Sequence, residues 1–363
     1  MVLHKLTKQV EDSKIQNASV LDANKELSEE FYHEREETDL LGINILNYFM
    51  DKDKKHVLVM GGKGSGKTAI TMMLLAEAKT MYDDVSVEYI NCIEHDTTRK
   101  IYKKISKNSK NDENSCTNKF IQFCKNQKKL VIVLDEVHLL RDDTIFYQVS
   151  RYTELDNVLL IMISNRPNID SILSADTQSS LYYSVIGFKS YNSSDIYNIL
   201  RKRAETSFLE VTDDDERVFR IIAARTSNVM ISDVRVALKT MRNLYCSDMD
   251  KTQLNISSLM DVEDKNIQLA TLRNLSDTQR EILLCVAKYE LTNVAYAKYI
   301  EQGLGSLSKK QFFKHVNELQ RLGVVRLSDA RVNQGLTKKV EVCVDSCVVD
   351  EYCGTGQTTT QHL

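Results

Sequence analysis

Residues 61–68, GGKGSGKT, constrain the fold of this chain more than any other segment. They satisfy the pattern G-x-x-x-x-G-K-[ST], follow the apolar run HVLVM and precede the helical pattern AITMMLLAEA. A glycine-rich turn between a strand and a helix lets backbone N–H groups approach phosphate oxygens, with the lysine at the β and γ phosphates and the threonine on Mg²⁺. The segment therefore predicts a site for ATP or ADP with Mg²⁺, whose loop residues are Gly61, Gly62, Lys63, Gly64, Ser65, Gly66, Lys67 and Thr68.

Apolar runs that alternate with helical patterns predict the α/β fold class with a parallel sheet. The runs VSVEYINC, KLVIVLDE and VLLIMISN follow the loop, with a helical stretch between each pair. Short, continuous runs rich in Val, Ile and Leu are typical of strands buried on both faces. After about residue 191 helical periodicity takes over, and from residue 276 three helical patterns precede two short strands, VVRLS and KKVEVCVD, around the loop RVNQGLT. That last pattern indicates a winged helix.

The length of 363 residues allows two or three hydrophobic cores. The N-terminus has no apolar signal segment, and no apolar run approaches the roughly 18 residues of a membrane span. We therefore expect a cytoplasmic protein without a membrane partner. Its expected parts are a polar arm over 1–27, an α/β nucleotide-binding domain over 28–190, a helical lid over 191–270, a winged-helix DNA-binding domain over 271–348 and a disordered tail over 349–363.

Two carboxylates end the apolar run KLVIVLDE, at the edge of a parallel sheet where ligands bind. We predict that Asp135 holds the Mg²⁺ shell and that Glu136 polarises a water molecule against the γ-phosphate. Two carboxylates that merely cap a strand would look the same in isolation. The phosphate loop upstream favours the catalytic reading.

Two further polar residues are candidates for the same site. Asn165 ends the run LLIMISN, and it lies beside the γ-phosphate if its strand neighbours the strand of the loop. Arg235 stands near the start of an amphipathic helix, from which it can reach the phosphates. A solvated helix arginine would give the same local pattern.

The segment 305–340 contains eight basic and two acidic side chains, a local charge of +6 in a chain whose formal net charge is −3. Within it, SKKQFFKHVNELQRLG has apolar residues at helical spacing and basic residues on the other faces. An ordinary solvated helix would show similar charges, but a wing follows this one. We predict a recognition helix and a wing that contact double-stranded DNA through Lys309, Lys310, Gln311, Lys314, Lys338 and Lys339.

A resemblance rests on the order of several motifs: YHEREE, GGKGSGKT, VEYINC, VLDEVHLL, ISN, SSLYYSVIGFKSYNSSDIYNILRKRAETSF, SDVRVAL and the winged-helix tail. In this order they resemble the AAA+ DNA replication initiators of the archaeal origin-recognition-complex and cell-division-control type. The resemblance covers about residues 28–345. It implies an AAA+ P-loop ATPase domain, a helical lid and a C-terminal winged helix.

The resemblance also implies roles for individual residues. The loop from Gly61 to Thr68 is Walker A, and Asp135 with Glu136 is Walker B. Three further roles also follow from the resemblance. Asn165 is sensor 1, Arg235 is sensor 2, and the region of Arg35 and Glu36 lies near the adenine. The catalytic set is then Glu136, Asn165 and Arg235. The nucleotide-binding set adds Arg35, Tyr191 and Arg235 to the loop, and the metal set is Thr68 and Asp135.

One departure from the family affects the expected rate of hydrolysis. The family carries basic residues just before SSL, one of them an arginine finger, whereas ADTQSSL has Asp176 and Gln178 there. The resemblance therefore implies a slow, switch-type ATPase. Its expected partners are replication-origin duplex and the replicative helicase, and we expect a monomer in solution that assembles on DNA. The alternative is a signalling or transposition-regulating ATPase whose winged helix makes protein contacts or controls transcription.

Overall fold

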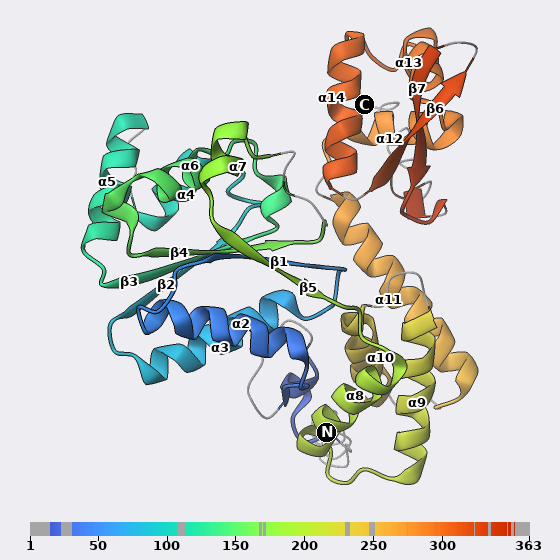
Figure 1. The fold of residues 1–363 in the computed structure, drawn as a ribbon. Helices are drawn as coiled ribbons and strands as arrows, with labels where there is room; N and C mark the ends of the chain where they lie inside the picture. Colours follow the sequence, from blue (N-terminus) through green and yellow to red (C-terminus); the bar gives the residue numbers. More distant parts are fainter. Residues whose placement is uncertain are drawn as a thin grey trace, which may run out of the picture. The chain divides into compact units, whose positions relative to one another are not determined.

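A computed structural model describes residues 15–22, 31–107, 113–166, 169, 172–228, 233–246, 251–273, 275–322, 324–332, 335–346, 348–349 and 352. The chain divides into two compact units, Met1–Leu259 and Met260–Leu363, which are described separately (Figure 1). Among the described residues, no helix combines the length and the hydropathy that crossing a membrane requires.

The first unit is built on a five-stranded sheet with the order β2-β3-β4-β1-β5, in which all pairings are parallel. The four apolar runs predicted as strands are confirmed. β5 was not predicted: only Ile186 and Phe188 of its run YSVIGF are buried, and Ser184 and Gly187 interrupt the apolar residues. The bounds are β1 His56–Gly61, β2 Val85–Asn91, β3 Lys129–Asp135, β4 Val158–Ser164 and β5 Tyr183–Phe188.

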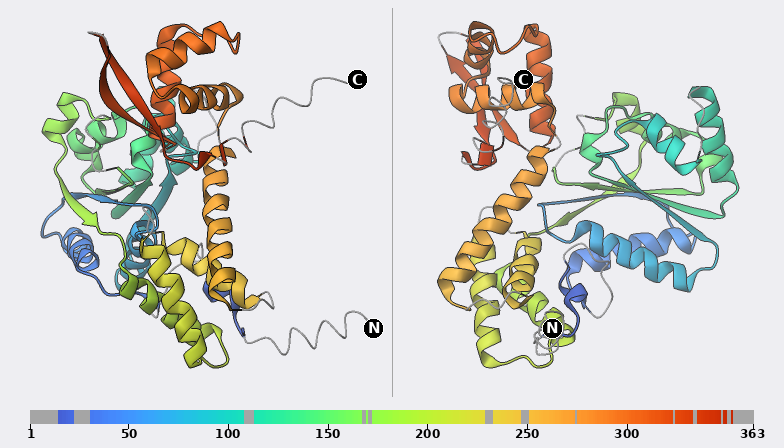
Figure 2. Two further views of the ribbon diagram at one scale, coloured as in Figure 1. Left: turned by 90° about the vertical axis from the view of Figure 1, so that its right-hand side faces the viewer. Right: turned by 180° about the vertical axis from the view of Figure 1, so that it is seen from behind.

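Helices cover both faces of this sheet, as the two views in Figure 2 show. The side chains of β3 alternate between two cores, so that Ile132 packs with Phe120 and Phe146, while Val131 and Val133 pack on the opposite face. One face carries α2 Glu36–Phe49 and α3 Lys67–Met81. The other carries α4 Thr98–Ile105, α5 Glu113–Lys125, α6 Thr144–Arg151 and α7 Ala175–Ser180, with the short helices η3 Val137–Leu139 and η4 Thr153–Leu155 between strands.

Three helices follow the sheet in the first unit, and we call them the helical lid: α8 Ser193–Ser207, α9 Asp213–Asn228 and α10 Val234–Cys246. The predicted polar arm over 1–27 is wrong for its described part, because η1 Ala18–Leu21 packs on α8 and α10. Val20 and Leu21 are buried there, and the Arg203 Nη1 donates to the Val20 carbonyl at 2.5 Å. Two apolar residues in a polar stretch were enough to anchor it.

The second unit follows the chain order predicted for a winged helix, with three helices and then an antiparallel pair of strands. Helix α11 Gln253–Arg273 precedes them, and Phe312, Val316 and Leu319 of the third helix fill the core. The predicted tail starts too early at 349, since Val349 is buried against this core. The elements are α12 Asp277–Tyr289, α13 Thr292–Glu301, α14 Lys309–Arg321, β6 Val325–Val332 and β7 Gly335–Val342.

Candidate functional site

The glycine loop joins β1 to α3 at the carboxyl-terminal edge of the sheet, with Gly66 as the N-cap of the helix. Gly64 and Gly66 have φ angles of 71° and 86°, which favour glycine. Neighbours also exclude larger residues, since a Cβ on Gly66 would lie 2.6 Å from the Tyr191 hydroxyl and a Cβ on Gly64 would clash with Asp233. The helical lid and the segment before it therefore touch the loop directly.

Lys67 projects back into this loop and is only 5% exposed. Its Nζ donates to the carbonyls of Gly61 and Gly62 at 2.9 and 2.7 Å and to Asn165 Oδ1 at 2.8 Å. Burial lowers the pKa of Lys67 to about 8. Within the described part of the chain, none of its hydrogen-bond partners is a carboxylate, so this buried ammonium fits a site that receives an anion.

Thr68 and Asp135 meet at the sheet edge, as predicted for a metal pair. The Thr68 hydroxyl donates to Asp135 Oδ2 at 2.8 Å, and the Tyr89 hydroxyl donates to the same oxygen at 2.8 Å. Hydroxyl and carboxylate oxygens are ligands that suit Mg²⁺, which also keeps waters and phosphate oxygens in its shell. Sequence analysis missed Tyr89, although it lies in the motif VEYINC, because the pairing of β2 with β3 was needed to bring it to Asp135.

Glu136 follows directly, with a φ of 55°, which is uncommon for a residue other than glycine. The amide of Asn165 donates to both of its carboxylate oxygens, at 2.6 and 2.7 Å. Burial, together with the adjacent charge of Asp135, raises the pKa of Glu136. Because β4 lies between β1 and β3, Asn165 connects Lys67 to Glu136 in one hydrogen-bonded chain.

Arg35 reaches the loop from the segment before α2. Its guanidinium donates to the carbonyls of Ser65 and Lys189 at 2.8 and 2.7 Å, pairs with Glu37 and lies over the Tyr191 ring at 4.6 Å. The structure thus brings Arg35 and Tyr191 to the loop, and it uses the polar edges of Arg35 for protein contacts. Glu37, which also accepts from the Lys189 N–H, was missed although it belongs to the motif YHEREE.

Arg235 is also brought to the site, from the first turn of α10. It pairs with Asp233, another residue that the sequence analysis did not assign. The remaining predicted loop residues line the same turn, where the Gly62 carbonyl accepts from the Ser65 hydroxyl at 2.9 Å. Burial raises the pKa of Glu136, and the positive charge of Lys63 opposes this effect in part.

The second unit presents the residues that were predicted to contact DNA. Lys309, Lys310 and Lys314 are exposed on α14, and Lys338 and Lys339 are exposed on β7. Lys339 pairs loosely with Glu290, at 3.5 Å.

Gln311, which is predicted to contact DNA, also has a local contact: its Oε1 accepts from the N–H and the hydroxyl of Ser308 at 3.0 and 2.8 Å. It completes the capping box of α14. Only its amide N–H groups remain for another partner.

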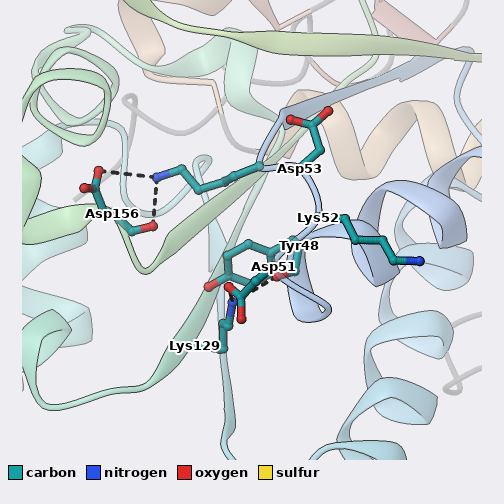
Figure 3. Close-up of a pocket in the computed structure, with 7 residues that line it drawn as sticks. Tyr48, Asp51, Lys52, Asp53, Lys129 and Asp156 are labelled. Carbon is teal, nitrogen blue, oxygen red and sulfur yellow. Dashed lines mark hydrogen bonds and ion pairs between the residues drawn. The ribbon is translucent and has the colours of Figure 1, made fainter.

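A separate cavity of about 330 Å³ lies at the opposite edge of the sheet, before β1, β3 and β4 (Figure 3). Lys54 donates to the Asp156 carbonyl at 2.9 Å, and Lys129 pairs with Asp51. Both lysines lie within ion-pair distance of a carboxylate, that of Asp156 or that of Asp51, whereas the hydrogen-bond partners of Lys67 are uncharged. The glycine loop remains the candidate site.

Comparisons with known proteins agree with this geometry. The AAA domain family matches residues 50–173. The ORC1-type DNA replication protein 1 of Methanothermobacter thermautotrophicus is 26% identical over 310 residues, which cover 77% of this chain and 80% of that protein. The protein of the same description from Sulfurisphaera tokodaii is 26% identical over 360 residues, which cover 87% of each chain.

Solved structures show the same fold. The Aeropyrum pernix ORC1 protein in complex with DNA superposes with a TM-score of 0.72 at 21% identity, covering 95% of this chain and 98% of that one. The CDC6P of Pyrobaculum aerophilum gives a TM-score of 0.59 at 16% identity, covering 94% and 99%. The parallel P-loop sheet and its loop residues thus accompany similarity to archaeal ORC1-type DNA replication proteins along most of the chain, and residues 50–173 match the AAA domain family.

Proposed function

We propose that the protein is an ATP-dependent DNA replication initiator, which binds origin duplex and helps to recruit the replicative helicase. The observation that carries the proposal is the hydrogen-bonded chain from Lys67 through Asn165 to Glu136, in a loop that the helical lid touches. The names of the archaeal relatives support replication as the process.

The residues of the site suit ATP or ADP with Mg²⁺. In the proposed complex, the N–H groups of the loop and Lys67 bind the phosphates, and Thr68 and Asp135 contribute oxygens to Mg²⁺, which neutralises phosphate charge. Glu136, oriented by Asn165, positions a water molecule. Because Tyr191 and Asp233, which directly precede the lid helices α8 and α10, lie against the loop, we expect the bound nucleotide to change the position of the lid.

Slow hydrolysis is part of this proposal. Helix α7 exposes Asp176 and Gln178, and its N-cap Ser174 is bound to Asp143, to which its N–H and hydroxyl donate at 2.7 and 2.6 Å. A second copy that docked through α7 would bring a carboxylate to a phosphate site rather than a cation. Turnover per molecule should therefore stay constant as protein concentration rises. Steady-state phosphate release, measured over a roughly hundredfold range of protein concentration, tests this. A steep rise would contradict it.

DNA contact is proposed for the basic surface of the second unit, formed by α14 and β7. The first unit has a further basic surface that the sequence analysis did not assign. It surrounds a cavity of about 310 Å³ lined by Lys100, Lys103, Lys104, His95 and Glu94. The exposed Ile93 precedes these residues in the chain, and Lys100 pairs with Asp96 at 2.6 Å.

Immunoprecipitation of the protein from its host, followed by sequencing of the bound DNA, tests the proposed function. Enrichment at a replication origin is the expected result. The full-length variant Lys338→Glu/Lys339→Glu should recover less DNA overall with the same preference for origin over other sequences, because phosphate contacts do not read sequence. Binding without any origin signal, or self-assembly on ATP without duplex binding, would favour the signalling or transposition-regulating alternative.

A further inference from the structure

Tyr89 reaches the site from a neighbouring strand. Its hydroxyl donates to Asp135 Oδ2 at 2.8 Å, and the residue is 38% exposed. The pairing of β2 with β3 places Asn91, and not Tyr89, opposite Asp135. The phenol therefore extends over two residues along the strand, about 6.6 Å at the rise of a parallel strand. A serine or threonine hydroxyl at position 89 would be too short to make this contact.

The Asp135 carboxylate, to which this hydroxyl donates, is fixed at both of its oxygens. Oδ1 accepts the Glu136 N–H at 2.8 Å, and Oδ2 accepts the hydroxyls of Thr68 and Tyr89, each at 2.8 Å. Asp135 is 8% exposed. Because the N–H comes from the next residue in the chain, the two hydroxyls are the donors that tie the carboxylate to other elements of the fold.

The two hydroxyls differ in what holds them. Thr68 belongs to the phosphate loop and to the predicted metal set, and its oxygen keeps lone pairs for a cation while its proton points to Asp135. Tyr89 lies on β2, which is separated by β3 and β4 from the strand that leads into the loop. The Tyr89 donor is therefore positioned by strand pairing and not by the loop that receives the phosphates.

We propose that Tyr89 is a positioning residue, whose hydroxyl orients the Asp135 carboxylate and thereby raises the affinity of the nucleotide-bound protein for Mg²⁺. The inference rests on the proposed nucleotide function. A carboxylate that is already oriented loses less rotational freedom when the cation arrives. Hydrogen-bond partners of metal ligands typically contribute about 10- to 100-fold to metal affinity. We expect the lower end of this range, because Thr68 and the Glu136 N–H still hold the carboxylate without Tyr89.

The test compares the dissociation constant of labelled ATP in EDTA with that in saturating Mg²⁺, for full-length protein. The ratio of the first to the second equals the Mg²⁺ affinity of protein-bound ATP divided by that of free ATP, because the binding steps form a closed cycle. Free ATP is common to all variants, so a changed ratio reports the metal affinity of the complex. Tyr89→Phe keeps the ring and should lower the ratio by about tenfold, with the EDTA value unchanged.

Further variants separate the hydroxyl from the ring and from the fold. Tyr89→Leu lacks both ring and hydroxyl and should give the same ratio as Tyr89→Phe. The double variant Tyr89→Phe/Asp135→Asn should match Asp135→Asn alone, because Tyr89 acts through the carboxylate. Tyr147→Phe removes a hydroxyl from a residue of α6 that is 39% exposed, and this matched control should keep the ratio of the unmodified chain.

Several results would overturn the inference. They are an unchanged or raised ratio in Tyr89→Phe, a fall in Tyr89→Leu alone, or additive effects in the double variant. Equal ATP affinity of the unmodified chain in EDTA and in Mg²⁺, or no ATP binding at all, would instead overturn the proposed nucleotide and metal site. The two failures are therefore distinguishable.

Discussion

The phosphate loop of the first unit and the basic surface of the second unit both carry lysines, but they use them in opposite ways. Lys67 is 5% exposed and its Nζ donates to four residues, Gly61, Gly62, Ser65 and Asn165, whereas Lys338 is exposed on β7. The loop groups depend on one another, since Asn165 bonds both Lys67 and Glu136. The exposed lysines have weak partners, such as Glu290 for Lys339.

This difference separates a site where one buried charge matters by itself from a surface where only the combined charge of several exposed side chains matters. A buried, hydrogen-bonded charge is poorly screened by salt, and its removal leaves partners unsatisfied. An exposed charge is screened and contributes little alone. We therefore expect single substitutions to have large effects in the loop, and salt with charge reversal to have graded effects on the second unit.

The largest expected effect concerns Glu136. Glu136→Gln should preserve ATP binding and lower turnover by about 100-fold or more, because the amide cannot accept a proton from water. Nucleotide affinity and steady-state phosphate release measure the two properties. Glu77→Gln, on the exposed face of α3, is the control. Unchanged turnover would remove Glu136 from its catalytic role.

Next in size is Lys67→Ala, which should weaken ATP and ADP binding by at least about tenfold through the loss of a charge-assisted contact to phosphate. Titration with labelled nucleotide measures it, with Lys52→Ala, an exposed lysine of the same unit, as the control. A loss of less than about threefold, under 1 kcal/mol, would contradict the phosphate loop.

A smaller effect is expected on the basic surface. With about three to five phosphate contacts, the logarithm of DNA affinity should fall with the logarithm of salt with a slope of roughly −3 to −4.5. Lys338→Glu/Lys339→Glu should flatten the slope by about 2 and weaken random and origin duplexes alike, because phosphate contacts position without reading sequence.

Lys265→Glu/Lys288→Glu changes the total charge equally on exposed residues of α11 and α12 and is the control for this variant. A flat salt response in the unmodified chain would mean that the second unit serves protein contacts.

The smallest expected effect is on the free energy of unfolding. It distinguishes the two units, because the acid-sensitive histidine lies in the first. His56 accepts the Leu160 N–H at 3.0 Å, and burial lowers its pKa to about 3. Between that value and about 6.5 the unfolded chain binds a proton that the folded chain does not, so stability falls as pH falls, by at most about 1.4 kcal/mol per unit.

Urea denaturation of the first unit at several values between pH 5 and 7 measures this loss of unfolding free energy. His56→Gln, whose amide oxygen accepts the same N–H, should flatten the dependence. An equal slope in this variant would assign the acid sensitivity to other groups.

The sequence by itself determined the phosphate loop, four of the five strands of the sheet and the order of elements in the second unit. These features rest on local rules: the loop pattern needs glycine at fixed spacing, and a strand buried on both faces needs a continuous apolar run. The same rules recovered Asp135, Glu136 and Asn165, because each one directly follows or ends such a run.

Tertiary structure alone decided the partners of those residues. The pairing of β2 with β3 brings Tyr89 to Asp135, the packing of α10 brings Asp233 to Gly64, and the Ser308 cap takes the Oε1 of Gln311. The contacts of Tyr89 with Asp135 and of Asp233 with Gly64 join segments far apart in the chain. The Ser308 contact occupies an oxygen of Gln311 that a DNA base could otherwise have used. Local patterns specify which residues can act, whereas hydrogen-bond partners depend on distances that only the packed sheet and helices define.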